Sequence, residues 1–281
     1  MIQNILTFDI EDWFHILDLE ETANVTDWHH YDSRIHVGLE KILSACSDAN
    51  VHGTFFILGW IAKKYPRLIN EIANLGHEIA CHSNEHPLVY EIGKNKFKYD
   101  TLKALEHINN ACGIIPTIYR APGFSITNAT PWAYEVLSSL NFTVDCSIFP
   151  MQRGHGGYAT YKNYSPHLVC SDFHDPIVSM PVSIANYKVF RMAYSGGGYF
   201  RLLPYSLIKL IFSMRDYNMT YFHPRDFDAE QPYLEGLSRI RKFKSYVGLK
   251  HSEEKFRKLL SDFQFLRVTD YLSQTVYRKY L

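Results

Sequence analysis

Short apolar runs alternate with amphipathic segments along this chain, and this alternation constrains the fold more than any other feature. Runs rich in β-branched and aromatic residues predict strands over residues 5–10, 52–57, 78–82, 118–120, 143–147, 177–182 and 219–223. Apolar residues at helical spacing predict helices over 36–49, 66–75, 96–112 and 130–140. Strands and helices in this order predict parallel βαβ units in an α/β fold.

Composition narrows the function. The chain has 281 residues, of which 46% are hydrophobic, and its 29 Lys and Arg balance 29 Asp and Glu. A neutral chain lacks the basic excess that holds a polyphosphate backbone, so we expect no nucleic-acid partner. The sequence contains no Ser/Gly-rich linker and no internal repeat. The aperiodic stretch 151–175, rich in Gly, Tyr and His, is interpreted as a long loop or lid in which His155 could touch a substrate.

Cysteine usage and the N-terminus indicate a compartment. The five cysteines are widely spaced and form no CxxC pair, which is typical of reduced thiols. The opening MIQNILTFDIEDWFH has no basic region followed by an apolar stretch. No run approaches the ~18 apolar residues of a spanning helix. We therefore expect a cytoplasmic protein without an integral membrane segment, and the sequence assigns no oligomeric state.

Ionisable residues follow the predicted strands at their carboxyl ends. They are Asp9, Glu11 and Asp12 after the first strand, His82 and His86 after the third, Arg120 in the fourth, Asp145 in the fifth and His223 in the last. In a parallel barrel these ends meet on one face, where chemistry is concentrated. Two imidazoles and a carboxylate suit Zn²⁺ and leave a position open.

The pair His82 and His86 allows more than one interpretation. A spacing of four puts two imidazoles on one side of a helical turn, where they could share an ion. The segment also matches H-x-x-E-H, an inverted metallopeptidase motif in which Glu85 would be the base. That motif needs a continuous helix, whereas a strand-like segment precedes it and Pro87 disfavours the α conformation at His86.

Five ordered segments carry a family resemblance. They are LTFDIEDWFH, TFFILGWIAKKYP with GHEIACHSNEHP, YRAPGFSI, VDCSIFP and YFHPRDFD. Together they resemble the NodB-homology polysaccharide deacetylases (carbohydrate esterase family 4), and SGGGYFRLLPY is similar to the C-terminal extension of the branch found in bacterial exopolysaccharide and capsule clusters. The resemblance implies an irregular (β/α)7-type barrel over residues 1–281 as one catalytic domain, with residues from about 190 completing the barrel.

The resemblance also implies residue roles. Asp9 matches the general base, Arg120 the arginine that orients it, and His223 the general acid, with Asp226, Asp228 or Asp145 as candidate partners of His223. His82 and His86 match the metal-binding histidines. The family's metal-binding Asp directly follows the base, but Ile10 stands there in this chain. We expect Asp12 as the carboxylate ligand, with Glu11 as the alternative.

Further expectations concern the ligands. We expect Zn²⁺ as the ion, with Co²⁺ or Ni²⁺ possible substitutes. The expected substrate-binding residues are Trp13, Pro122, Gly123, Phe124, Asp145 and Tyr199. The expected reaction removes an acetyl group from an N-acetylated amino sugar, as an oligosaccharide or as a lipid- or nucleotide-linked precursor, during surface polysaccharide biosynthesis.

Three other functions remain open on this sequence. One is an amide hydrolase of the same fold acting on a non-glycan substrate, and another is a catalytically inactive carbohydrate-binding barrel. A glycoside hydrolase with Asp9 and Asp12 as its acid pair is the third, but it would leave both histidines and Arg120 without a role.

Overall fold

The computed structural model describes residues 3–17, 19, 22, 24–172, 174–187 and 190–281. Its strands are β1 (Gln3–Ile5), β2 (Thr7–Ile10), β3 (Thr54–Ile57), β4 (Glu78–Cys81), β5 (Ile118–Tyr119), β6 (Val144–Asp145), β7 (His167–Ser171), β8 (His174–Ser179), β9 (Ile184–Tyr187), β10 (Phe190–Ala193), β11 (Tyr217–Met219) and β12 (Phe265–Leu266). Each of the seven predicted strand regions overlaps one of these strands, but β8 begins before the predicted region 177–182, and β11 shares only Met219 with the predicted region 219–223.

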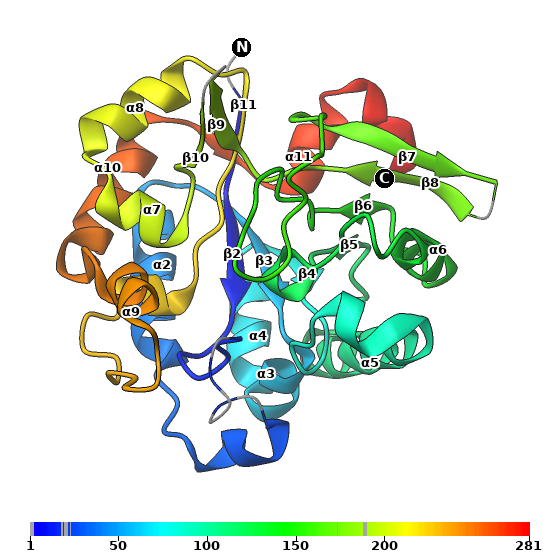
Figure 1. The fold of residues 1–281 in the computed structure, drawn as a ribbon, viewed down its shortest axis with the longest axis horizontal. Coiled ribbons are helices and arrows are strands. Elements are labelled where there is room, and N and C mark those ends of the chain that lie inside the picture. The colour runs from blue at the N-terminus through cyan, green and yellow to red at the C-terminus, as the bar shows by residue number, and fades with distance from the viewer. Residues whose placement is uncertain (1–2, 18, 20–21, 23, 173, 188–189) are drawn as a thin grey trace.

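The main sheet is parallel except at one edge. Its order is β2-β3-β4-β5-β6-β8-β7, and only β7 runs antiparallel to its neighbour β8. On the other side, β1 pairs in parallel with both β11 and β12, and Phe8 in β2 bridges to Phe222. Strands β1 and β2 therefore link the main sheet to β11 and β12, which come from the last third of the chain. This linkage curves the strands toward a closed barrel (Figure 1).

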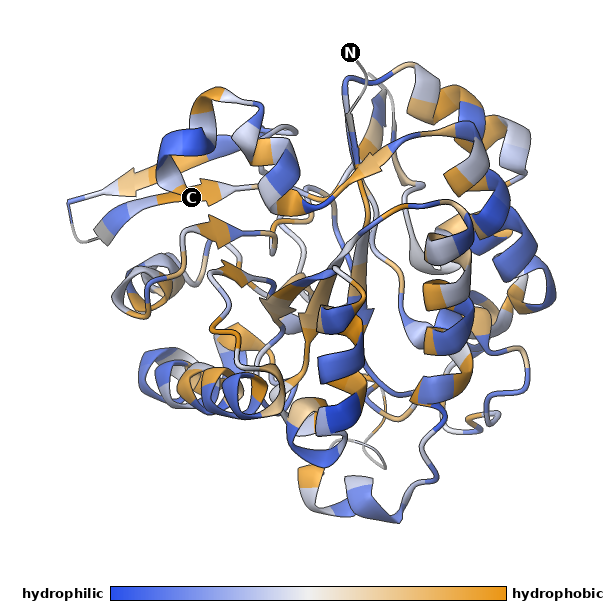
Figure 2. Ribbon diagram, turned by 180° about the vertical axis from the view of Figure 1, so that it is seen from behind, coloured by the Kyte–Doolittle hydropathy of each residue, from blue (hydrophilic) through white to orange (hydrophobic). Residues whose placement is uncertain are grey.

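Helices surround these strands (Figure 1). They are α2 (Ile35–Asp48), α3 (Gly59–Lys64), α4 (Pro66–Asn74), α5 (Val89–Cys112), α6 (Trp132–Ser139), α7 (Gly197–Leu202), α8 (Tyr205–Ser213), α9 (Arg239–Tyr246), α10 (Ser252–Asp262) and α11 (Val268–Ser273), with short 3-10 helices η1 (Val25–His30), η2 (Pro122–Phe124), η3 (Pro224–Phe227), η4 (Leu249–His251) and η5 (Val276–Tyr280). Figure 2 shows apolar central strands and helices that are polar along part of their surface, as expected where a helix covers a sheet.

The predicted helices are present, with shifted ends. Residues 96–112 are the second part of α5, which begins at Val89 and contains a non-helical residue, Gly93. The predicted loop 151–175 is partly wrong, because residues 167–171 form β7 and pair with β8. None of the described helices is long and apolar enough to cross a membrane.

Two features of the backbone position the functional end of the barrel. After β4, Ser83 and His86 have φ angles of 68° and 57°, so the chain turns sharply instead of continuing as a helix. Before α7, a Cβ on Gly196 would lie 1.7 Å from the carbonyl oxygen of Tyr221, so only glycine lets these two segments cross. The first turn holds His86, and the second lies next to the strand end that carries His223.

Candidate metal and acid–base site

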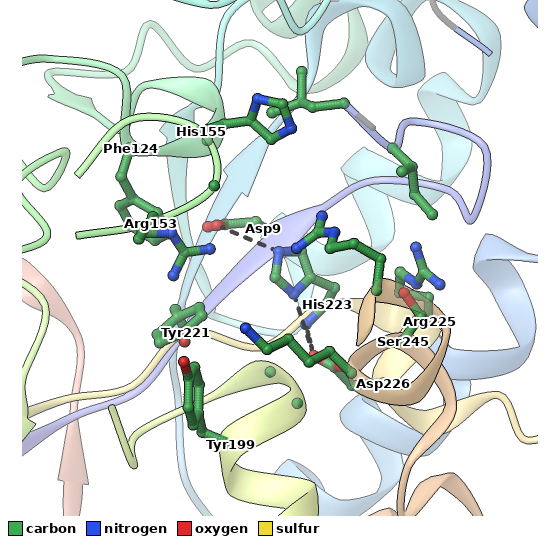
Figure 3. Close-up of a pocket in the computed structure, with 18 of the residues that line it drawn as sticks. Asp9, Phe124, Arg153, His155, Tyr199, Tyr221, His223, Arg225, Asp226 and Ser245 are labelled. Carbon is green, nitrogen blue, oxygen red and sulfur yellow. Dashed lines mark hydrogen bonds and ion pairs between the residues drawn. The ribbon is translucent and has the colours of Figure 1, made fainter. Parts of the chain in front are cut away.

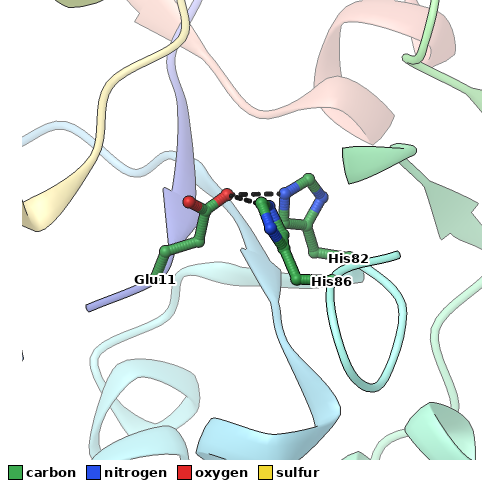
Figure 4. A group of neighbouring side chains, drawn as sticks. All are labelled: Glu11, His82 and His86. Carbon is green, nitrogen blue, oxygen red and sulfur yellow. Dashed lines mark hydrogen bonds and ion pairs between the residues drawn. The ribbon is translucent and has the colours of Figure 1, made fainter. Parts of the chain in front are cut away.

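Glu11, His82 and His86 meet beyond the ends of β2 and β4 (Figure 4). One oxygen of Glu11, Oε1, lies 2.8 Å from Nε2 of His82 and 2.9 Å from Nε2 of His86. All three side chains are buried. A sharp turn at residues 83–86 brings the two histidines together. Residues 82–86 therefore do not form the helix that an H-x-x-E-H metallopeptidase requires.

The chemistry of these donor atoms fits a cation. Nδ1 of His82 lies 2.8 Å from the carbonyl oxygen of Arg120, which can only accept a hydrogen bond. In a neutral His82 the proton is therefore on Nδ1, and the lone pair of Nε2 faces the Glu11 carboxylate. A positive charge has to lie between these groups. This arrangement of a metal-ligating histidine fixed through its other nitrogen is common in metalloproteins.

Charge keeps Glu11 ionised. Burial alone would raise the pKa of Glu11, but the charge of His86 and hydrogen bonds with both histidines hold that pKa well below its usual range. Since metal ligands must be deprotonated, a carboxylate ionised across neutral pH is the form that binding needs.

Asp12, the expected carboxylate ligand, is not part of this group. Its Oδ1 accepts hydrogen bonds from the backbone N–H groups of Trp13 (2.8 Å) and Arg34 (3.1 Å), and its Oδ2 accepts one from the Ser33 hydroxyl. The structure therefore corrects the expectation: Glu11, the alternative, lies with the histidines, and Asp12 fixes the loop after β2.

Asp9 lies next to this group and is held by Arg120. Nη1 of Arg120 donates to Oδ1 of Asp9 at 2.6 Å and to the Thr7 hydroxyl at 2.9 Å. The guanidinium is fully buried and lies 3.9 Å from the centre of the Phe56 ring. Arg120 thus has one available position, and its hydrogen bond holds the Asp9 carboxylate in one orientation.

His223 faces Asp9 from the other side of the site (Figure 3). Its Nε2 lies 3.8 Å from Oδ2 of Asp9, and its Nδ1 lies 3.2 Å from Oδ2 of Asp226. Burial lowers the pKa of His223, but the hydrogen bond to Asp226 and the charges of Glu11, Asp226 and Asp9 raise it to about 9.

Asp226 is the partner of His223 among the three candidates. It also accepts a hydrogen bond from the His223 backbone N–H and lies 3.1 Å from Nε of Arg201. Asp228 instead forms an ion pair with Arg34, and Asp145 accepts hydrogen bonds from Ser147 and Tyr134.

A cavity of about 470 Å³ opens over the site. Of the expected substrate-binding residues, Gly123, Phe124 and Tyr199 line it, as does His155 of the predicted lid. Trp13, Pro122 and Asp145 are buried and are not among the residues that line this cavity, so their expected contact with substrate stays a prediction.

The cavity wall also contains basic residues that the sequence interpretation missed. Arg153 lies over the rings of Phe124 and Tyr221, and Arg225 lies in the wall of the same cavity (Figure 3). Arg153 is two residues from His155 in the predicted lid, so the sequence could have indicated that it lines the cavity. Arg225 follows His223 by two residues, but no sequence pattern shows which way it points.

Two family models match consecutive parts of the chain. The polysaccharide deacetylase model matches residues 28–144, and a model described as a domain of unknown function (DUF3473) matches residues 146–273. Residues 28–144 are therefore similar to the polysaccharide deacetylase family, and the region that follows them is similar to DUF3473. The exopolysaccharide and capsule branch stays a prediction.

Characterised relatives match the first half only in part. The chain is 35% identical over 96 residues to the peptidoglycan-N-acetylglucosamine deacetylase of Bacillus cereus, a match that covers 34% of this chain and 35% of the relative. It is 33% identical over 72 residues to a chitooligosaccharide deacetylase of Sinorhizobium fredii, covering 26% of this chain and 34% of the relative. The chain thus spans about a third of the length of each of these relatives.

Solved structures confirm the predicted fold. A Mycobacterium smegmatis protein assigned to the polysaccharide deacetylases superposes with a TM-score of 0.65 at 18% identity, over 99% of this chain and 91% of that one. A pseudoenzyme of carbohydrate esterase family 4 from Bacillus anthracis has a TM-score of 0.50 at 12% identity, over 96% of this chain and 65% of that one. At these identities the likeness shows the fold alone.

Proposed function

We propose that this protein is a metal-dependent carbohydrate N-deacetylase. The observation that carries the proposal is the arrangement of Glu11 with His82 and His86, next to a base already paired with Arg120 and opposite a histidine already paired with Asp226. The deacetylase relatives support an N-acetylated sugar as the substrate.

Glu11, His82 and His86 would hold the ion. Two imidazole nitrogens and one carboxylate oxygen suit Zn²⁺, and Co²⁺ or Ni²⁺ can replace it in such a ligand set. When bound, a divalent ion polarises the acetyl carbonyl and makes a nearby water more acidic.

The side chains of the protein handle the protons. Asp9 accepts the proton of the attacking water, and the hydrogen bond from Arg120 fixes the direction of its carboxylate. His223 donates a proton to the departing amine, because its partner Asp226 keeps the imidazole protonated at neutral pH. The two groups lie 3.8 Å apart in the wall of the same cavity, so a single acetamido group can contact both.

The biological setting is also part of the proposal. We infer that the protein acts on a saccharide precursor in the cytoplasm, during assembly of a surface polysaccharide. All five cysteines are free thiols, which agrees with a reducing compartment.

Acetate release is the test of the function. The zinc-loaded protein is expected to release acetate from chitooligosaccharides or from smaller N-acetylglucosamine derivatives. A His82→Gln/His86→Gln variant should lose at least about 100-fold in kcat/KM, since even changes outside the ligand set cost 10–100-fold. His29→Gln is the matched control, because His29 is exposed and outside the site.

Other outcomes would identify a different protein. Zinc-dependent hydrolysis of simple amides but of no acetamido sugar would establish the amide hydrolase. Saccharide binding without acetate release from any substrate would establish the inactive binding barrel. A protein of this fold from Bacillus anthracis is described as a pseudoenzyme.

A further inference from the structure

The cavity wall contains more positive than negative side chains. Its acids are Asp9, Glu11 and Asp226, and its arginines and lysines are Arg153, Arg201, Arg225, Arg241 and Lys244. Each acid already has partners: Asp9 has Arg120 and His223, Glu11 has the two histidines, and Asp226 has Arg201 and His223. Within the described part of the chain, none of these acids forms an ion pair with Arg225 or Lys244.

Arg201 and Arg225 lie in the same wall and differ in what they contact. Arg201 donates hydrogen bonds to the backbone carbonyls of Lys244, Ser245 and Val247 and pairs with Asp226, so its role is structural. Nη2 of Arg225 is buried and has no hydrogen-bond partner. Burial lowers the pKa of Arg225, and the nearby charge of Asp226 offsets this only in part. A buried guanidinium of this kind needs an acceptor.

Helix α9 adds positive charge at the same side. The stretch 236–252, which contains α9, has five Lys and Arg and no Asp or Glu. Arg241 and Lys244 of this helix line the cavity, and Phe243 between them does too. Close packing fixes the helix there: a Cβ on Gly198 would lie 2.6 Å from the Lys244 carbonyl oxygen, and one on Gly248 would lie 2.5 Å from that of Arg201.

We infer that Arg225, Arg241 and Lys244 form an anion-binding subsite for a phosphate carried by the sugar whose acetamido group reaches Glu11, His82 and His86. This inference rests on the proposed function and deepens it: the substrate is an N-acetylamino sugar linked to a phosphate or diphosphate. Two guanidinium groups and an ammonium match a group with several oxygens and more than one charge, and arginine binds phosphate through two parallel hydrogen bonds. A lipid-linked and a nucleotide-linked sugar share this chemistry.

The test compares one sugar with and without the phosphate. We expect the zinc-loaded protein to prefer N-acetylglucosamine 1-phosphate over N-acetylglucosamine by about 10-fold or more in kcat/KM, because hydrogen bonds to charged groups are the strong ones. In an Arg225→Gln/Lys244→Gln variant this preference should fall by about 10- to 100-fold. Lys242→Gln should keep it, because Lys242 lies over the Tyr233 ring and does not line the cavity.

Two further arms identify the source of the phosphate. Uridine diphosphate-linked and polyprenyl diphosphate-linked N-acetylglucosamine are compared with a neutral chitooligosaccharide, and preference for either diphosphate supports the subsite. Equal use of neutral and phosphorylated sugars by the wild type overturns it while the deacetylase function stands. Preference for a uronic acid-containing oligosaccharide over every phosphorylated sugar also overturns it.

A binding measurement separates the two possible failures. If no substrate releases acetate, the proposed function fails, and calorimetry with N-acetylglucosamine 1-phosphate then decides the subsite alone. Binding that is at least about 10-fold weaker in the Arg225→Gln/Lys244→Gln variant than in Lys242→Gln supports the subsite. Equal binding to both variants overturns it.

Discussion

Replacing each of two adjacent acids by its amide separates the metal ligand from the structural residue. Glu11→Gln and Asp12→Asn change similar groups one position apart in the chain. In the structure only Glu11 faces the histidines, at 2.8 and 2.9 Å, whereas Asp12 accepts three hydrogen bonds from the loop that it fixes. We therefore expect Glu11→Gln to lower the affinity for zinc and Asp12→Asn to lower the stability of the fold.

The expected sizes follow from what each carboxylate contacts. Glu11→Gln removes the only negative charge among three ligands, so zinc affinity should fall by at least about 100-fold, or ~2.7 kcal/mol. Asp12→Asn weakens charge-assisted hydrogen bonds at a buried site and should cost about 1–3 kcal/mol of unfolding free energy. For a chain of this size that lowers Tm by about 2–4 °C per kcal/mol.

Zinc titration followed by thermal unfolding measures both quantities on the same samples. In the wild type and in Asp12→Asn, zinc at 100 times its Kd should add about 2.7 kcal/mol of stability and raise Tm by about 5 °C or more. At the same zinc concentration, Glu11→Gln should show little of this increase. The reasoning would be refuted if Asp12→Asn lost zinc and Glu11→Gln bound it like the wild type.

Three further predictions concern the acid, the histidine loop and the strand crossing. Burial lowers the pKa of His223, whereas the hydrogen bond and charge of Asp226 raise it to about 9. Because a general acid works only while it is protonated, Asp226→Asn should move the alkaline fall of kcat from near pH 9 to lower pH. An unchanged pH profile of kcat would contradict this prediction. Asp100 accepts hydrogen bonds from two backbone N–H groups of the loop between His82 and His86, at 2.9 and 3.1 Å. Asp100→Asn should therefore lower the free energy of unfolding in urea by about 1–3 kcal/mol and weaken zinc binding. Unaltered zinc affinity would show that the loop does not need these hydrogen bonds. Gly196→Ala would place a Cβ 1.7 Å from a carbonyl oxygen and should cost about 3 kcal/mol or more in the same assay, whereas Gly154→Ala, which meets nothing within 4 Å, should be tolerated.

The sequence allows the main sheet to be predicted because its strands are buried on both faces. Such strands are continuous apolar runs, and polar residues at their ends are conspicuous. His82, Arg120 and His223 could be recognised in this way, since each lies at or directly after the end of a predicted strand. The antiparallel edge strand β7 was missed because it is partly exposed and therefore lacks the apolar run of the buried strands.

The alternation of side chains along a strand, which can be read from the sequence, distinguishes Glu11 from Asp12 as the expected metal ligand. Side chains in a strand alternate between two faces, so Asp9 and Glu11, two residues apart, point the same way. Ranking the ligand by residue type favoured Asp12, but continuing the alternation one residue beyond β2 would have favoured Glu11. The role of Asp145, in contrast, could not be predicted from the sequence, because its hydrogen bonds with Ser147 and Tyr134 form only in the folded chain.

The subsite cations could not be predicted, since their position depends on contacts between distant segments. Helix α9 lies against the cavity because Gly198 in α7 and Gly248 after α9 permit close backbone approach. In the sequence, its basic residues have the pattern of an ordinary solvated helix surface.

The two halves recognised by the family models together build one site. The first half supplies His82, His86 and Arg120, and the second half supplies His223 and Asp226. Asp9 and Glu11 precede both matched regions, on the strand segment that pairs with β3 on one side and bridges to Phe222 on the other. That segment fixes the distance between His223, the proposed acid, and the two histidines proposed to bind the ion. Because the DUF3473 region completes the sheet and carries His223, the proposed acid, together with the arginines and lysines that line the cavity, we expect differences in substrate among proteins of this kind to follow changes in this region, while the proposed ion-binding residues remain the same.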